Sequence, residues 1–354
     1  LAETGADVVR IERMHSGRPF LDMQPAYDLD RHGRAILRID LKRVEGIETV
    51  LRLAERADVL VEGFRPGVME RLGLGPETVA ARNPCLVYGR MTGFGQTGPL
   101  AERAGHDLTY LAYSGVLHTI GPEGGKPVPP LNLVADYGGG TMFLVTGILA
   151  ALLEHTRSGK GQVVDTAMVE GAAMLSAPTH AYMAAGIWQD RRGQNLLDGG
   201  APFYDTYETA DGRHIAVACL EPQFFAEFAR LLPLDPHFVA AQYDRSQWQQ
   251  MRAAITQRVY EKTRDEWVEL FEVSDACVAP VLSLAEAPGH KHNRARQTFA
   301  EAGALTRPAP APRFSRTPAT MASGGAVQAD AVLERLGLSK AELEALAKSG
   351  VLAR

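Results

Sequence analysis

The feature that most constrains the fold is an alternation of short apolar runs with segments of helical spacing at the start of the chain. Such runs, bounded by turn residues, are typical of buried strands, and strands that alternate with helices favour parallel βαβ units with helices on both faces. The predicted strands are Val8–Ile11, Ala35–Leu41, Asp58–Glu62 and Cys85–Met91, and the predicted helices are Glu45–Ala57, Val68–Gly73 and Pro76–Asn83.

The composition sets the broad class of protein. The chain has 354 residues, 45% of them hydrophobic and 22% charged, which suits a soluble globular protein with a sizeable core in two domains. A net charge of -5 argues against a general nucleic-acid binder, so any anion site must be a local basic cluster. We see no run of about 18 apolar residues and therefore expect no membrane span.

The three cysteines, Cys85, Cys219 and Cys277, are far apart in sequence and match no metal-ligand spacing. Unpaired cysteines of this kind indicate a reducing compartment, and we expect a cytoplasmic protein. No targeting signal is visible, and the histidines show no persuasive spacing with acids or cysteines. The sequence therefore predicts no metal site.

The later part of the chain predicts a second, smaller α+β region. Its strands are expected at Phe203–Thr209, His214–Cys219 and Cys277–Leu282, and its helices at Pro222–Leu232, Gln247–Tyr260 and Arg264–Ser274. Before it come a helix at Asp136–Glu154, a strand at Val163–Asp165 and a long apolar helix at Met168–Met183. After it come an extended segment, Arg307–Ala322, and a tail, Asp330–Ala353, that is helical in two pieces with a capping box at Ser339 and Glu342.

The stretch Ala104–Ala151 carries the residues best suited to chemistry. His106 has a side chain that titrates near neutral pH, and Asp136 is predicted to cap a helix that opens with glycines, among them Gly138 and Gly139. Backbone N–H groups and the dipole of such a helix favour negative charge. For His106 alone, a helix-cap or core position is the more ordinary explanation, and for Asp136 alone a simple N-cap is as ordinary as a catalytic role. Gly93–Gly98 fits GxGxxG, but Pro99 follows and no apolar helix opens there, so a turn or substrate loop is favoured over a dinucleotide site.

Long motifs in a fixed order resemble the family III CoA-transferase superfamily (CaiB/BaiF-like), and within it the α-methylacyl-CoA racemases. They are EGFRPGVMERLGLG from Glu62, MTGFGQTGP from Met91, GHDLTYLAYSG from Gly105, PPLNLVADYGGG from Pro129, SGKGQVVD from Ser158 and LDGGAPFYDTYETADGRHIAVACLEPQF from Leu197. The resemblance implies a Rossmann-like parallel-sheet large domain, a smaller α+β domain and an interlocked homodimer with active sites shared between subunits. It also implies an acyl-CoA substrate whose C2 configuration is inverted through an enolate, without metal or cofactor.

The resemblance also assigns roles to residues. His106 and Asp136 correspond to the two proton-handling residues, and Glu221 of the partner subunit supports His106. The residues that contact CoA or line the acyl site are implied to be Arg13, Lys42, Arg65, Arg71, Asp107, Tyr110 and Tyr204, to which the helix glycines Gly138 and Gly139 are added on physical grounds. Arg65 and Arg71 also follow a strand, at the edge where open α/β sheets bind ligands.

The predicted domains are a large CoA-binding domain at 1–187, a linker at 188–202, a small domain at 203–300, and a return segment with C-terminal helices at 301–354. Family members commonly begin with a strand before the position of Leu1, so we expect residues upstream of it. The nearest alternative function is a CoA-transferase in which Asp136 attacks the thioester and forms a mixed anhydride. A non-catalytic acyl-CoA-binding protein and an NAD-linked dehydrogenase are more distant alternatives.

Overall fold

A computed structural model describes residues 1–14, 27–303, 305–321 and 329–353. The chain divides into two compact units, and each is described by itself. The first comprises Leu1–Gly105, Asp136–Gly171 and Pro288–Arg354, and the second comprises His106–Ala135 and Ala172–Ala287. These units differ from the predicted domains, because residues 106–135 and 172–187 group with the second region and the C-terminal segment groups with the first.

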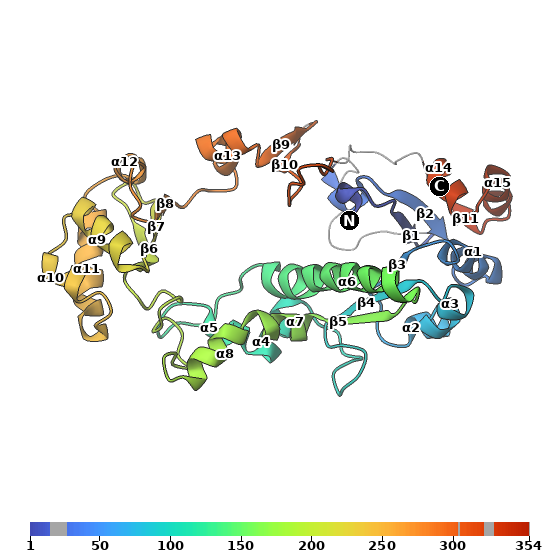
Figure 1. Cartoon of the computed structure of the whole chain (residues 1–354), viewed down its shortest axis with the longest axis horizontal. Coiled ribbons are helices and arrows are strands. Elements are labelled where there is room, and N and C mark those ends of the chain that lie inside the picture. Colours follow the sequence, from blue (N-terminus) through green and yellow to red (C-terminus); the bar gives the residue numbers. More distant parts are fainter. Residues whose placement is uncertain (15–26, 304, 322–328, 354) are drawn as a thin grey trace. The chain divides into compact units, whose positions relative to one another are not determined.

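The first unit is built on two three-stranded sheets and a hairpin (Figure 1). One sheet has parallel β1 and β2 with β11 antiparallel to β2, the other is entirely parallel in the order β3-β4-β5, and β9 pairs with β10. The strands are β1 (Val9–Glu12), β2 (Ala35–Ile39), β3 (Val59–Glu62), β4 (Val87–Thr92), β5 (Val163–Ala167), β9 (Phe299–Ala302), β10 (Leu305–Pro308) and β11 (Leu352–Ala353). The prediction of parallel strands is confirmed for β1 and β2 and for β3, β4 and β5, which lie in two separate sheets, whereas β9, β10 and β11 pair antiparallel.

Helices such as α1 pack on these sheets through an apolar stripe, whereas α13 has no buried residue. On α1, for example, Val50, Leu51 and Leu53 are buried in a core with Leu37 and Ile39 of β2. The helices of this unit are α1 (Val44–Ala54), α2 (Val68–Arg71), α3 (Pro76–Arg82), α6 (Phe143–Ser158), α13 (Lys291–Arg296), α14 (Ala329–Arg335) and α15 (Lys340–Lys348). The two predicted C-terminal helices are confirmed, as is the capping box of Ser339 and Glu342.

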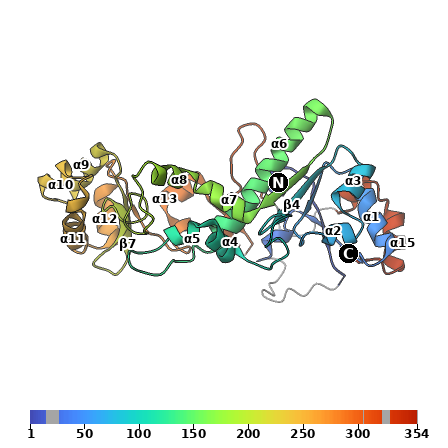
Figure 2. The ribbon, with the colours of Figure 1, turned by 90° about the horizontal axis from the view of Figure 1, so that it is seen from below.

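The long helix α6 lies against β4 and β5 (Figure 2). Leu144, Ile148 and Ala151 of the helix form a buried cluster with Val87. Gly89 of β4 makes this approach possible, because a Cβ there would come within 3.2 Å of the side chains of Leu144 and Ile148. The sheet and the helix that follows the candidate site are therefore packed as one piece within the first unit.

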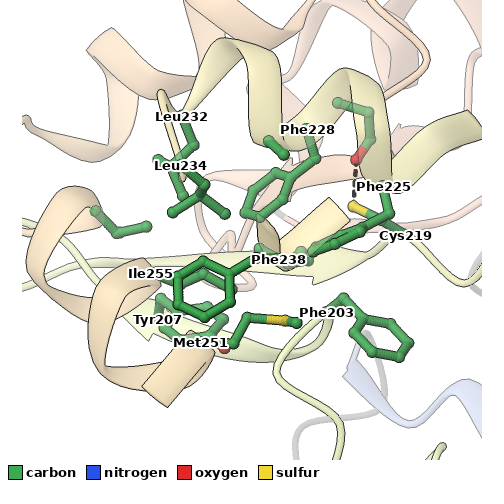
Figure 3. Close-up of a cluster of buried hydrophobic side chains, with 14 of the residues drawn as sticks. Phe203, Tyr207, Cys219, Phe225, Phe228, Leu232, Leu234, Phe238, Met251 and Ile255 are labelled. Carbon is green, nitrogen blue, oxygen red and sulfur yellow. Dashed lines mark hydrogen bonds between the residues drawn. The ribbon is translucent and has the colours of Figure 1, made fainter. Parts of the chain in front are cut away.

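The second unit holds an antiparallel sheet, β6-β7-β8, covered by helices. Its core is rich in aromatic rings, among them Phe203, Phe225 and Phe228, which are fully buried (Figure 3). Each such side chain contributes roughly 1.5–3 kcal/mol by leaving water. The elements are β6 (Tyr204–Glu208), β7 (His214–Ala218), β8 (Val278–Pro280), α4 (Asp107–Ser114), α5 (Val116–Thr119), α8 (Ala177–Ala184), α9 (Pro222–Leu231), α10 (Pro236–Ala240), α11 (Trp248–Val259) and α12 (Arg264–Phe271).

Several predicted elements are divided or bounded differently. The single helix predicted at Met168–Met183 is two helices, α7 (Met168–Leu175) and α8, because Pro178 in the first turn of α8 lacks the N–H that would continue α7. The predicted linker 188–202 belongs to the second unit as ordered turns around the fully buried Asn195. The predicted extended segment begins inside the β9–β10 hairpin, and its last residue, Ala322, lies outside the described residues. Short 3₁₀ helices occupy Ala2–Thr4, Leu29–Arg31, Arg245–Gln247 and Ala287–Gly289.

Candidate functional site

His106 lies at the N-cap of α4, in the second unit, with its side chain exposed. The local bonds at this position are made by its backbone: the N–H donates to Thr109 Oγ1 at 3.0 Å, and the carbonyl accepts from the N–H of Thr109 at 2.8 Å. The helix start therefore holds the backbone of His106 and leaves the imidazole presented to solvent. A side chain held in this way is available to exchange a proton with a ligand.

Asp107, the next residue, is turned inward and is only 4% exposed. Its Oδ2 accepts a hydrogen bond of 2.8 Å from the backbone N–H of Ala135. Asp107 immediately follows His106, and Ala135 immediately precedes Asp136. The bond therefore joins the chain neighbours of the two candidates for proton transfer. Asp107, predicted to line the substrate site, thus accepts a hydrogen bond from the backbone. Tyr110, predicted to line the same site, is also buried.

Asp136 lies in a ten-residue π-helix, Leu133–Met142, that runs directly into α6. The helix begins three residues earlier than predicted, so Asp136 is in its first turn and the predicted N-cap is wrong. In a π-helix each N–H bonds five residues back, so the N–H groups at the helix start need partners from outside the helix, and that of Ala135 already donates to Asp107. The glycine N–H groups at 138 and 139 have partner carbonyls within the helix. The helix start, rather than the glycines, is therefore where a developing anion would be stabilised.

The glycine run has a packing role in addition to its predicted one. A Cβ on Gly171 of α7 would stand 1.9 Å from the carbonyl oxygen of Gly139, so the two backbones are in direct contact. Gly139 and Gly140 are buried, and Asp136 is half-buried. This contact fixes the helix that carries Asp136 against the start of α7, whose residues 168–171 belong to the first unit.

Glu221 lies at the N-cap of α9 in the second unit and is exposed. Burial, and then the negative charge of Glu221, raise the pKa of the Cys277 thiol, so the carboxylate and this cysteine are neighbours. Tyr204, at the start of β6, is half-buried and lines a cavity of about 1210 Å³ within the second unit. The same cavity includes Arg252, which forms an ion pair with Asp205.

The basic candidates Arg13, Lys42, Arg65 and Arg71 all lie in the first unit and are exposed. Arg65 is in the loop that follows β3, and Arg71 ends α2. Neither arginine forms an ion pair with any residue that the structure describes. Exposed guanidinium groups without carboxylate partners suit phosphate groups, which they bind through two parallel hydrogen bonds.

The GxGxxG segment forms a turn, with Gly95 and Gly98 at positive φ and no helix beginning there. Gly95 N–H donates to Thr92 Oγ1 at 2.9 Å, which closes the turn at the end of β4. Residues 96–99 and 101–103, together with Pro66, line a cavity of about 570 Å³. The prediction of a loop, and not a dinucleotide-binding fingerprint, is confirmed. The loop lines the same cavity as Pro66, the residue that follows Arg65.

Sequence reasoning overlooked a group of charges, the buried pair Glu62 and Arg90 and the exposed Glu70 that Arg90 also binds. The available signal was an arginine within the apolar strand that we predicted at Cys85–Met91. A buried strand carries an arginine only when carboxylates are in reach. Among the described residues, no group of three or more His, Cys, Asp or Glu is arranged to hold a metal ion.

The candidates are thus distributed over both units. His106, Asp107, Tyr110, Tyr204 and Glu221 are in the second, whereas Asp136, its glycines and the basic residues are in the first. The Asp107–Ala135 hydrogen bond lies within the second unit. The fold is that of a mixed α/β protein with a parallel sheet and several small sheets, and its exposed candidate cations lie in the first unit.

The chain belongs to CoA-transferase family III, whose model matches residues 1–325. The alpha-methylacyl-CoA racemase of Mus musculus is 49% identical over 321 residues, covering 90% of this chain and 82% of that protein. The protein of the same name from Homo sapiens is 43% identical over 355 residues, covering 97% and 89%. A solved CAIB/BAIF family protein from Brucella suis is similar in fold, with a TM-score of 0.76, 26% identity, and coverage of 94% of this chain and 92% of that one.

Proposed function

We propose that this protein is a racemase that interconverts (2R)- and (2S)-2-methylacyl-CoA thioesters. The observation that carries the proposal is family membership together with two racemases at 43% identity or more over most of this chain. The hydrogen bond from Ala135 N–H to Asp107 adds that, within the second unit, the chain next to His106 is held to the residue that precedes Asp136. The exposed arginines of the first unit fit a substrate that carries phosphate groups.

In the proposed mechanism, one residue removes the C2 proton and the other returns a proton to the opposite face. His106 is the base in one direction and the acid in the other, with Asp136 in the complementary role. Glu221 holds the imidazole in one tautomer and stabilises its protonated form. Negative charge that develops on the thioester oxygen is stabilised by the positive end of the π-helix at residues 133–137. We also propose that the large domain has a Rossmann-like fold.

The competing activity is CoA transfer, in which Asp136 attacks the thioester carbonyl and releases the CoA thiolate. Incubation of (2R)-2-methylacyl-CoA in D₂O separates the two. A racemase incorporates deuterium at C2 and forms the (2S) thioester with no acceptor acid present, as chiral chromatography and mass spectrometry would show. Movement of CoA to an added carboxylic acid, without deuterium at C2, would exclude the racemase.

We also propose that the protein is a homodimer with shared active sites. Its support is the apolar surface of α6, where Leu149 and Leu153 are exposed although the opposite face packs on the sheet. By length and composition alone the continuous helix Leu133–Ser158, with a mean hydropathy of 1.4 in its most apolar window, could also cross a membrane. The expected absence of a membrane span therefore stays a prediction. The three cysteines are free, which supports a reducing, cytoplasmic location.

Co-expression of two inactive chains tests the shared site. If His106 of one subunit works with Glu221 of the other, a heterodimer of His106→Ala and Glu221→Ala contains one intact site and one doubly altered site. Purified through two different tags, it should have about half of the wild-type specific activity. Activity no higher than that of either homodimer would mean that each site is built from a single subunit.

A further inference from the structure

Arg90 is buried and binds two carboxylates, the buried Glu62 and the exposed Glu70. It lies on β4, the central strand of its sheet, with 8% of its side chain exposed, directly across from Glu62 in the β3–β4 register. Its Nε donates to Glu62 Oε1 at 2.7 Å, and the side chain of Glu62 is only 2% exposed. Charges this deeply buried are costly unless they are paired, so the two side chains fix each other's position.

The second oxygen of Glu62 reaches the loop that follows β3. Its Oε2 accepts a hydrogen bond of 2.7 Å from the backbone N–H of Phe64, the residue before Arg65. The guanidinium group of Arg90 is therefore connected, through one carboxylate, to the backbone on the N-terminal side of Arg65. A hydrogen bond to a charged acceptor holds this backbone more firmly than a neutral one would.

The remaining nitrogens of Arg90 hold α2. Nη1 and Nη2 donate to the two carboxylate oxygens of Glu70 at 2.8 and 3.3 Å, a bidentate pair. The hydrogen bond from Arg90 is the main reason that the pKa of the Glu70 carboxyl lies below its usual value. Glu70 is also packed beneath Gly75, where a Cβ would come within 2.9 Å of its Cγ. The C-terminal side of the loop is thereby attached to the same guanidinium group.

Two exposed arginines lie next to the two positions that are held in this way, the backbone of Phe64 and the side chain of Glu70. Arg65 lies between Phe64 and Glu70, and Arg71 immediately follows Glu70. Gly67, at φ +78°, turns the loop so that a Cβ on it would be 3.0 Å from Nη1 of Arg71, which places that guanidinium over the loop. Pro66 of the same loop lines the cavity of about 570 Å³.

We propose that Glu62, Arg90 and Glu70 are positioning residues that hold Arg65 and Arg71 in place for the phosphate groups of CoA. The inference rests on the proposed function, since it takes CoA to be the ligand of this loop. None of the three needs to touch the substrate. The arrangement lowers the cost of binding, because the loop is already ordered when the nucleotide arrives.

Glu70→Ala tests the proposal without leaving a buried charge, because Glu70 is 45% exposed and the Glu62–Arg90 pair remains. Titration calorimetry with free CoA should show a Kd raised roughly tenfold, as expected for loss of charge-assisted hydrogen bonds. Affinity for a pantetheine thioester, which lacks the nucleotide, should be unchanged. Arg90→Lys, which keeps the charge but not the bidentate geometry, should weaken CoA binding in the same selective way.

Glu77→Ala is the matched control, because Glu77 is an exposed acid in the first turn of the next helix, α3. It should bind both ligands like the wild type. Wild-type CoA affinity in Glu70→Ala, or equal loss of affinity for CoA and the pantetheine thioester, would overturn the proposal. These measurements need no turnover, so a wild-type protein that binds CoA but incorporates no deuterium would refute the racemase and leave the positioning role standing.

Discussion

His106→Ala is expected to lower the rate of C2 deuterium exchange by roughly 10²–10⁴-fold, the usual contribution of a positioned acid–base group. The N-cap of α4 should survive, because the hydrogen bonds at this position come from the backbone and from Thr109. Binding of free CoA should stay close to the wild-type value. Exchange is measured by mass spectrometry of the thioester in D₂O, and CoA binding by titration calorimetry.

His237→Ala provides the matched control for this variant. His237 is an exposed histidine in the first turn of α10, in the same unit, and its ring is paired with Asp235 at 2.9 Å. The His237→Ala variant should exchange deuterium at C2 at the wild-type rate. Retained exchange in His106→Ala would remove His106 from the mechanism. A variant that loses C2 exchange but transfers CoA to an acceptor acid would instead favour the aspartyl intermediate, which does not need the imidazole.

Asp136→Asn is expected to lower C2 exchange to a similar extent, since an amide of the same shape cannot accept the proton. The helix should be maintained, because Thr141 Oγ1 donates to the backbone carbonyl of residue 136 at 3.0 Å and not to its side chain. Racemisation from both the (2R) and the (2S) thioester should be followed by chiral chromatography. CoA affinity should change little, because the candidate phosphate ligands Arg65 and Arg71 are not altered.

The control for Asp136→Asn is Glu154→Gln, which replaces a carboxylate by an amide near the end of the same continuous helix. Glu154 accepts a hydrogen bond from Ser158 at 3.0 Å and is exposed. Its racemisation rate should match that of the wild type. If Asp136→Asn racemises normally in either direction, the two-base mechanism is wrong, and the second proton must be exchanged by another group or by water.

The local parts of the fold were predictable from the sequence, because the signals are local. The strands at Ala35–Ile39 and Val59–Glu62 are short apolar runs between turns, and the start of α15 is fixed by Ser339 and Glu342 within one turn. The division of Met168–Met183 into two helices was also readable, since Pro178 cannot continue a helix. A two-residue strand such as β11 carries no such signal, because its pairing with β2 depends on tertiary packing.

The candidate site was predictable as a set of residue types and only partly as an arrangement. The helix of Asp136 begins at Leu133 because π-helical bonding and the anchoring of Ala135 by Asp107 extend it backwards, and neither is encoded in an N-cap pattern. The Glu62–Arg90 pair joins residues 28 positions apart that only strand pairing brings together. Contacts of this kind form when strands pair in the sheet, and the periodicity of the sequence does not predict them.

The contact between Gly139 and Gly171 bears on any effort to alter acyl-chain preference by laboratory evolution. A Cβ on Gly171 would meet the backbone of Gly139, so no neighbouring side chain could be trimmed to make room for a residue larger than glycine at position 171. Libraries that randomise Gly171 would therefore spend most of their diversity on chains that cannot assemble. Variation is better directed to exposed residues at the helix start, such as Leu131 just before the helix and Leu133 at its first position, where side-chain size is not limited by this contact.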